Sequence, residues 1–134
     1  MDRKFYVSYE AARLLKEKGY RDKTMYGYCS KDQSMHTLDT REDYDWNYPD
    51  DEFYSTETGY HVEMFAAPTK AEAIDWLESK GITIDIHWIR FNENRRWNYS
   101  IFNCSTCDTI DTKYIFPTRL EAEEAAIIKA LEQL

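Results

Sequence analysis

The chain has 134 residues, and its 25 Asp and Glu outnumber its 17 Lys and Arg, which gives a formal net charge of −8. A chain of this size is typical of one domain that buries an ordinary hydrophobic core without disulfides or a structural metal. Its 43% apolar and 16% aromatic residues exclude the class of disordered chains. The acidic balance argues against nonspecific binding to nucleic acid or to anionic membranes.

Three segments have the pattern of amphipathic helices, namely 8–19, 68–81 and 117–134. The first opens on Ser8, a good N-cap residue. The other two open on Pro-Thr with a Glu three residues after the Thr, which predicts a capping box. A glycine, which easily takes the left-handed conformation at a helix end, closes the first two segments.

Between the last two helices, segments rich in β-branched and aromatic residues predict strands at 82–91, 97–104 and 109–116. In the first of them, apolar and polar residues alternate from Ile82 to Trp88, which indicates a sheet with one buried face. The connections between the strands are short and polar. They favour antiparallel hairpins.

Together these elements predict an α+β fold within a single domain, 1–134. An N-terminal α-β-β unit, in which a hairpin joins 24–29 to 35–38, precedes an α-β-β-β-α unit. We expect an antiparallel sheet with the helices mainly on one face. Residues 1–38 would supply a helix and a hairpin, and residues 68–134 would supply the core.

The segment 39–67 separates these two parts and holds nine acidic residues against one Arg, so its net charge equals that of the whole chain. We interpret it as a loop-like acidic aromatic insertion, and long loops in compact domains are often functional. The leading hypothesis is a small protein-interaction module that presents this segment to an unidentified basic or nucleic-acid-binding partner. Mimicry of a nucleic-acid surface is its sharper form. The residues expected to bind are Asp43, Tyr44, Asp45, Trp46, Asp50, Asp51 and Glu52.

Residues 69–134 resemble the double-stranded RNA-binding domain fold in the order and size of their elements, and the last helix has apolar residues at that family's packing positions. The resemblance implies fold and not function. The positions of the basic cluster with which that family reaches phosphates are Arg119, Leu120 and Glu123 here. Because phosphate neutralisation dominates affinity for duplex RNA, we expect this scaffold to lack that activity.

Most of the chain also resembles a family of short uncharacterised proteins of Bacteroidales and their prophages. The likeness rests on segments 6–19, 67–69 and 121–127 and on Trp76 and Leu77. It implies a cytosolic, phage-related context and supplies no catalytic residue.

An alternative function is a nucleic-acid-binding module that acts through Arg95, Arg96 and Arg119. Two guanidinium groups beside Trp97 at a hairpin are typical of surfaces that stack unpaired bases or hold phosphate. An exposed turn followed by core aromatics explains the same residues, and the negative charge of the chain opposes a polyanion. The sequence therefore favours a protein partner over nucleic acid.

The sequence predicts no metal ion, cofactor or catalytic site. Cys104 and Cys107 form a Cys-x-x-Cys that is half of a zinc site, but its other half is not visible. Asp43 and Asp45 begin a calcium-loop pattern that fails at Tyr48, where the loop needs Gly. The three histidines belong to no catalytic motif, so we do not expect an enzyme.

Targeting and membrane signals are also not predicted. No segment has the apolar length of a signal peptide or a transmembrane helix, and three cysteines are too few for a disulfide framework. We expect a reduced, cytoplasmic protein without membrane association.

Overall fold

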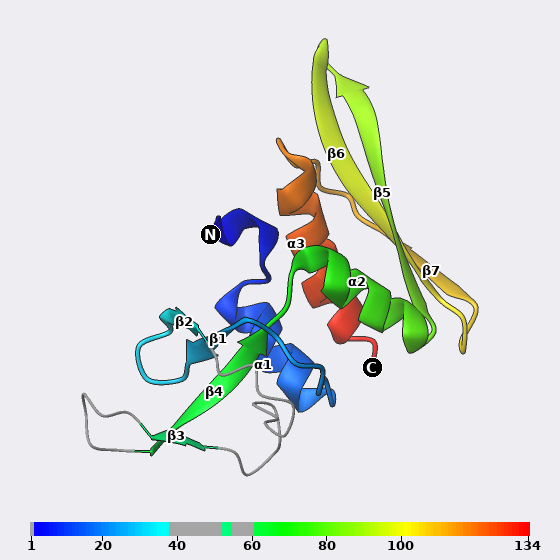
Figure 1. Ribbon diagram of the computed structural model, residues 1–134. Helices are drawn as coiled ribbons and strands as arrows, with labels where there is room; N and C mark the ends of the chain where they lie inside the picture. The colour runs from blue at the N-terminus through cyan, green and yellow to red at the C-terminus, as the bar shows by residue number, and fades with distance from the viewer. Residues whose placement is uncertain (1, 38–51, 55–60) are drawn as a thin grey trace. The chain divides into compact units, whose positions relative to one another are not determined.

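The computed structural model describes residues 2–37, 52–54 and 61–134 (Figure 1). The chain divides into two compact units, Tyr6–Pro68 and Met1–Phe5 with Thr69–Leu134. We call the first the inserted unit and the second the αβββα unit. The predicted α+β class is confirmed, but the strands form two antiparallel sheets where we expected one. The single domain stays a prediction.

The inserted unit contains one helix and a four-stranded antiparallel sheet in the order β2-β1-β4-β3. Its elements are α1 (Tyr9–Glu17), β1 (Tyr26–Cys29), β2 (Met35–Thr37), β3 (Glu52–Tyr54) and β4 (His61–Ala67). β1 pairs with β2 on one side and with β4 on the other. The predicted hairpin of 24–29 with 35–38 is therefore confirmed over its described residues.

Strands β3 and β4 lie within the segment 39–67, so the loop-like interpretation is wrong for residues 52–54 and 61–67. The four residues from Met64 to Ala67 are all buried. A strand covered on both faces has no alternation of polar and apolar residues, and that alternation is the pattern by which a strand is usually found in a sequence.

Local hydrogen bonds position α1 and close the inserted unit. Ser8 Oγ accepts a hydrogen bond from the backbone N–H of Ala11 (3.2 Å), which confirms the predicted N-cap. The Tyr28 hydroxyl donates to the carbonyl of Val7 (2.6 Å). The N–H of Val7 donates to the carbonyl of Pro68 (3.1 Å). The chain therefore enters and leaves this unit at neighbouring, hydrogen-bonded positions.

The αβββα unit has the predicted order of elements after a short 3-10 helix, and its sheet runs β5-β6-β7. Its elements are η1 (Arg3–Phe5), α2 (Lys70–Ser79), β5 (Ile82–Phe91), β6 (Asn94–Asn103), β7 (Asp108–Asp111) and α3 (Arg119–Leu131). β5 has the predicted bounds, and β6 begins three residues before the prediction.

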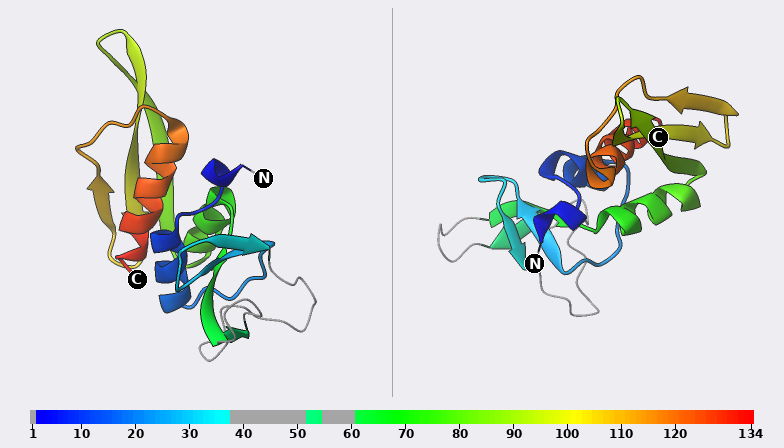
Figure 2. Two further views of the ribbon diagram at one scale, coloured as in Figure 1. Left: turned by 90° about the vertical axis from the view of Figure 1, so that its left-hand side faces the viewer. Right: turned by 90° about the horizontal axis from the view of Figure 1, so that it is seen from above.

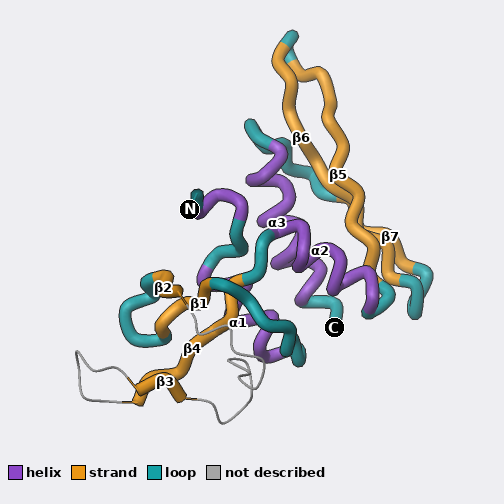
Figure 3. The backbone as a smooth tube through the Cα atoms, in the orientation of Figure 1, coloured by secondary structure: helices purple, strands orange, loops and turns teal. Residues whose placement is uncertain are grey.

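β7 ends at Asp111, whereas the prediction extends this strand to residue 116. The chain leaves the sheet edge there to cross to the start of α3 (Figure 3). Thr112 still donates its N–H to the carbonyl of Tyr99 (3.1 Å), and Phe116 forms an isolated bridge to Trp97. The apolar residues 114–116 indicate a strand by composition, but they belong to the segment that crosses to α3.

Both predicted capping boxes are present, at Thr69 with Glu72 and at Thr118 with Glu121. The predicted apolar stripe of α3 holds at Ile127 and Leu131, which are fully buried with three alanines. Leu134 lies beyond the helix and is exposed. Lys70 at the start of α2 is buried, and its Nζ donates to the carbonyl of Lys4 (2.8 Å), which attaches η1 to this unit.

Helices α2 and α3 pack against each other and against β5, and α3 also packs against β6 (Figure 2). Burial falls steadily along β5. Ile82 is fully buried, Ile84 and Ile86 are half-buried, and Trp88 is 58% exposed. The buried face that the alternation predicts is therefore present only near the start of the strand. The far half of the β5–β6 hairpin extends past both helices (Figure 1).

Candidate nucleic-acid interface

The far half of the β5–β6 hairpin carries arginine and tryptophan side chains on one face. Trp88 lies opposite Trp97, and Arg90 lies opposite Arg95. Directly opposite residues of an antiparallel pair point to the same side of the sheet, and so do alternate residues along a strand. These four residues thus share a face, and with Arg119 we call them the arginine–tryptophan surface.

Each tryptophan ring of this surface has a guanidinium group over it. The Cζ of Arg95 lies 5.1 Å from the centroid of the Trp88 ring. The Cζ of Arg119 lies 5.5 Å from the centroid of the Trp97 ring. Both distances are those of cation–π contacts. The arrangement holds planar cations and planar rings together at the protein surface.

The bridge between β6 and the segment before α3 brings Arg119 to this surface. The N–H of Trp97 donates to the carbonyl of Phe116 (2.9 Å), and the N–H of Phe116 donates to the carbonyl of Trp97 (2.7 Å). Arg119 follows three residues later, in the first turn of α3. Its Nε also donates to Glu123 Oε1 (3.1 Å), so one carboxylate partly compensates its charge.

The structure brings together three of the four residues proposed for nucleic-acid contact, Arg95, Trp97 and Arg119. Arg96 lies on the opposite face, because it pairs with Ile89, and its Nη1 donates to the carbonyl of Arg95 (2.9 Å). Trp88 and Arg90 were missed. Trp88 continues the alternation that begins at Ile82, and this pattern assigns it to the core.

The acidic residues of the leading hypothesis are not placed. Asp43, Tyr44, Asp45, Trp46, Asp50 and Asp51 lie outside the described residues. Glu52 begins β3 and is paired in register with Glu63 of β4.

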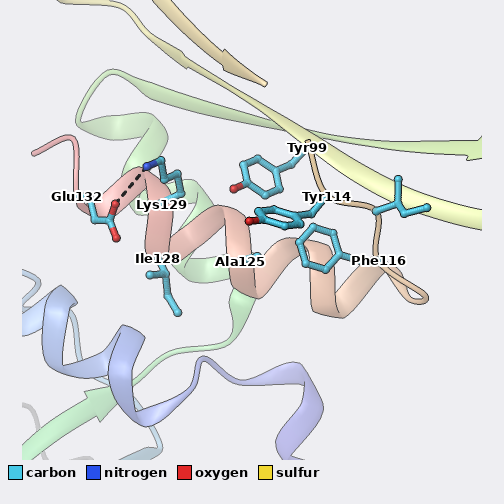
Figure 4. A pocket seen from close by; sticks show the side chains of 8 residues that line it. Tyr99, Tyr114, Phe116, Ala125, Ile128, Lys129 and Glu132 are labelled. Atoms are coloured by element: carbon cyan, nitrogen blue, oxygen red, sulfur yellow. Dashed lines mark ion pairs between the residues drawn. The ribbon is translucent and has the colours of Figure 1, made fainter. Parts of the chain in front are cut away.

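An aromatic groove of about 470 Å³ lies on the same unit, between α3 and the segment that precedes it. Tyr99, Tyr114 and Phe116 form its aromatic wall, and Figure 4 shows the three rings grouped above α3. The Tyr99 and Phe116 rings are stacked, with centroids 6.2 Å apart. The residues that α3 contributes are Ala125, Ile128, Lys129 and Glu132. The groove is therefore largely apolar, with one ion pair at its rim.

The opposite face of the sheet carries a hydrogen-bonded Ser, His and Asp. Ser100 Oγ donates to Asp111 Oδ1 (2.6 Å), and His87 Nε2 lies 3.2 Å from Ser100 Oγ. In a catalytic triad the histidine lies between the other two and takes the proton of the serine. Here the serine lies in the middle, and its hydroxyl donates a hydrogen bond to Asp111. The arrangement connects three strands and does not activate a nucleophile.

Cys104 and Cys107, the weak zinc candidates, are both exposed at the turn between β6 and β7. Cys29 is buried in the inserted unit. Over residues 2–37, 52–54 and 61–134, no three His, Cys, Asp or Glu side chains are grouped so that they could hold a metal ion. None of the helices in this part of the chain has the length and apolar character needed to cross a membrane.

No family model matches the chain, and the comparisons with curated proteins and with solved structures give no significant match. The resemblances to the double-stranded RNA-binding domain and to the prophage family therefore stay predictions.

Proposed function

We propose that the chain is a nucleic-acid-binding module that acts through the arginine–tryptophan surface. The observation that carries the proposal is the pair of cation–π contacts on one face, Arg95 with Trp88 and Arg119 with Trp97. Arginines neutralise phosphates, and exposed aromatic rings stack with bases. Arg95 and Arg119 were also expected from the sequence. Arg96 is not part of the proposed surface, whereas Trp88 and Arg90 are.

The exposure of Trp88 supports an interface. Trp88 is 58% exposed, and Phe91 nearby on the same strand is 49% exposed. Tryptophan is enriched where one molecule binds another, because it combines a large apolar area with a polar N–H group. Large aromatic residues exposed close together favour a binding role for this end of the hairpin.

The charge of the hairpin differs from that of the whole chain. Residues 88–98 contain Arg90, Arg95 and Arg96 against Glu93 alone, whereas the segment 39–67 accounts for a net charge of −8. At physiological ionic strength the Debye length is about 8 Å. A phosphate within this distance of the arginines is therefore governed mainly by their charge.

Binding would be measured by fluorescence anisotropy with labelled single-stranded and duplex RNA and DNA at low salt. We expect affinity that falls as salt rises, because phosphate contacts release counterions. Trp88→Ala is expected to weaken binding by about fivefold or more, because stacking of one base on an aromatic ring contributes about 1–3 kcal/mol.

Arg95→Ala and Arg96→Ala form a matched pair of variants. Both remove one guanidinium from adjacent positions of β6, but only Arg95 lies on the arginine–tryptophan surface. We expect the larger loss of affinity for Arg95→Ala. Equal losses would mean that net charge alone matters and would refute the assigned face. Absence of binding to every oligonucleotide would refute the function.

A protein-interaction role of the acidic segment is a second candidate function, favoured by the net charge of −8 within residues 39–67. Affinity capture would compare the native chain with a variant in which Asp43, Asp45, Asp50 and Asp51 are replaced by Asn. Recovery of the same partners by both proteins would contradict this role.

A further inference from the structure

We infer that the ligand of the arginine–tryptophan surface is a single strand, and that the aromatic groove takes one of its unpaired bases. This inference rests on the proposed function and names the substrate class. The groove adjoins the arginine–tryptophan surface at Phe116. The backbone of Phe116 is bridged to Trp97, and its ring is stacked on that of Tyr99.

Aromatic residues lie between the arginines and the groove. Tyr99 follows Trp97 by two residues on β6, so both side chains lie on the same face of the strand. Phe116 stacks on Tyr99, and Tyr114 lines the groove beside them. A strand that stacks one base on Trp97 and runs past Phe116 would bring a later base to Tyr114.

The chemistry of the groove suits a flat aromatic ring with a polar edge. Its volume of about 470 Å³ lies within the range of pockets that hold small ligands. Tyr114 is 75% exposed, which leaves it accessible to a base from solvent. The Tyr hydroxyls and the Lys129 ammonium provide polar groups at the rim, and Glu132 lies 3.5 Å from that ammonium.

The charge of the ligand and the accessibility of its bases distinguish a single strand from a peptide and from a duplex. The arginines beside the groove complement phosphates, which an apolar peptide does not carry. In a duplex the bases are stacked inside the helix, whereas the bases of a single strand can turn outward to meet aromatic side chains. A single strand therefore satisfies the arginines and the groove together.

The test measures the binding of four labelled probes of equal length to the full chain. The probes are a single-stranded oligonucleotide, the same strand in a duplex, an abasic strand that keeps its phosphates, and a poly-glutamate peptide of matched charge. The single strand is expected to bind at least tenfold more tightly than the others. Tyr114→Ala should weaken binding of the single strand about fivefold or more and leave binding of the abasic strand unchanged.

Tyr114→Phe serves as the matched variant, because it keeps the ring, and it should retain most of the affinity. Circular dichroism would establish that Tyr114→Ala folds, as expected for so exposed a side chain. If duplex and single strand bind alike, and Arg95→Ala weakens both whereas Tyr114→Ala weakens neither, the inference is wrong and the proposed function stands. Equal binding of the peptide, or of the abasic strand, would also overturn the inference. Failure of every nucleic acid to bind would overturn both proposals.

Discussion

Asp32 and Ser34 form a polar network in the turn between β1 and β2. The Ser34 hydroxyl and its backbone N–H both donate to Asp32 Oδ1, at 2.6 and 3.0 Å. These hydrogen bonds, the hydroxyl first, lower the pKa of Asp32 below its ordinary value. A carboxyl whose pKa is lowered by folding stabilises the fold above its ordinary pKa, and this contribution is lost as the pH falls through the lowered value.

We expect Ser34→Ala to raise the pKa of Asp32 towards that of a free Asp, about 3.9. Ser34→Thr retains the hydroxyl and should leave the pKa low. An NMR titration of the Asp32 carboxyl carbon would measure both. An unchanged pKa in the alanine variant would mean that the Ser34 hydroxyl is not the cause.

The N-cap of α3 is a second local determinant. Thr118 Oγ1 accepts from the N–H of Glu121, and Glu121 Oε2 accepts from the N–H of Thr118, each at 3.2 Å. Thr118→Ala should lower the free energy of unfolding by about 1 kcal/mol, measured in urea. Thr118→Ser is the control and should keep most of that stability. Equal stabilities of the alanine and serine variants would contradict the role of the cap.

At the scale of elements, the β5–β6 turn consists of Asn92 and Glu93, which both have positive φ, at 48° and 65°. Two-residue hairpin turns with this geometry prefer Asn-Gly, because glycine adopts a positive φ without strain. Glu93→Gly is therefore expected to stabilise the chain by roughly 0.5–1 kcal/mol. The urea midpoint would report the change.

Glu93→Gln separates this conformational effect from the effect of charge. Both variants remove the only carboxylate of the hairpin end, so both should strengthen binding of nucleic acid. Only the glycine variant should raise the urea midpoint. If the glutamine variant gains as much stability, charge repulsion and not backbone strain is the cause.

Features set by residues close together in the sequence can be predicted from it. The starts of the helices are predictable, because Ser8, Thr69 and Thr118 accept hydrogen bonds from residues only three positions away. The face on which Arg95 lies depends instead on the length of the β5–β6 turn. A connection one residue longer would shift the register and exchange the faces of Arg95 and Arg96.

Elements set by tertiary contacts are less predictable. The two-sided burial of Met64 to Ala67 hides β4 from a search for alternation. The end of β7 depends on the bridge between Trp97 and Phe116, which are far apart in the sequence. The exposure of Trp88 depends on where α2 and α3 cease to cover the sheet, and no local pattern encodes that boundary.

At the scale of the whole molecule, the acidic residues and the hairpin arginines lie in different parts of the sequence. Acidic residues concentrated in 39–67 repel a polyanion that approaches the arginines of the hairpin. Replacing Asp43, Asp45, Asp50 and Asp51 by Asn should strengthen nucleic-acid binding roughly two- to tenfold at about 20 mM salt. At about 300 mM salt the gain should disappear, and anisotropy would measure both. Weaker binding at low salt would show that the acids assist the ligand.

The hydrogen bond between Val7 and Pro68 joins the two ends of the inserted unit. The αβββα unit is assembled from residues 1–5 and 69–134, and the bond holds the two junctions together. Domain insertion is tolerated where the ends of the inserted piece lie close together, because the host closes across the break. We therefore expect the sequence between 6 and 68 to tolerate changes in length without altering the geometry of the arginine–tryptophan surface.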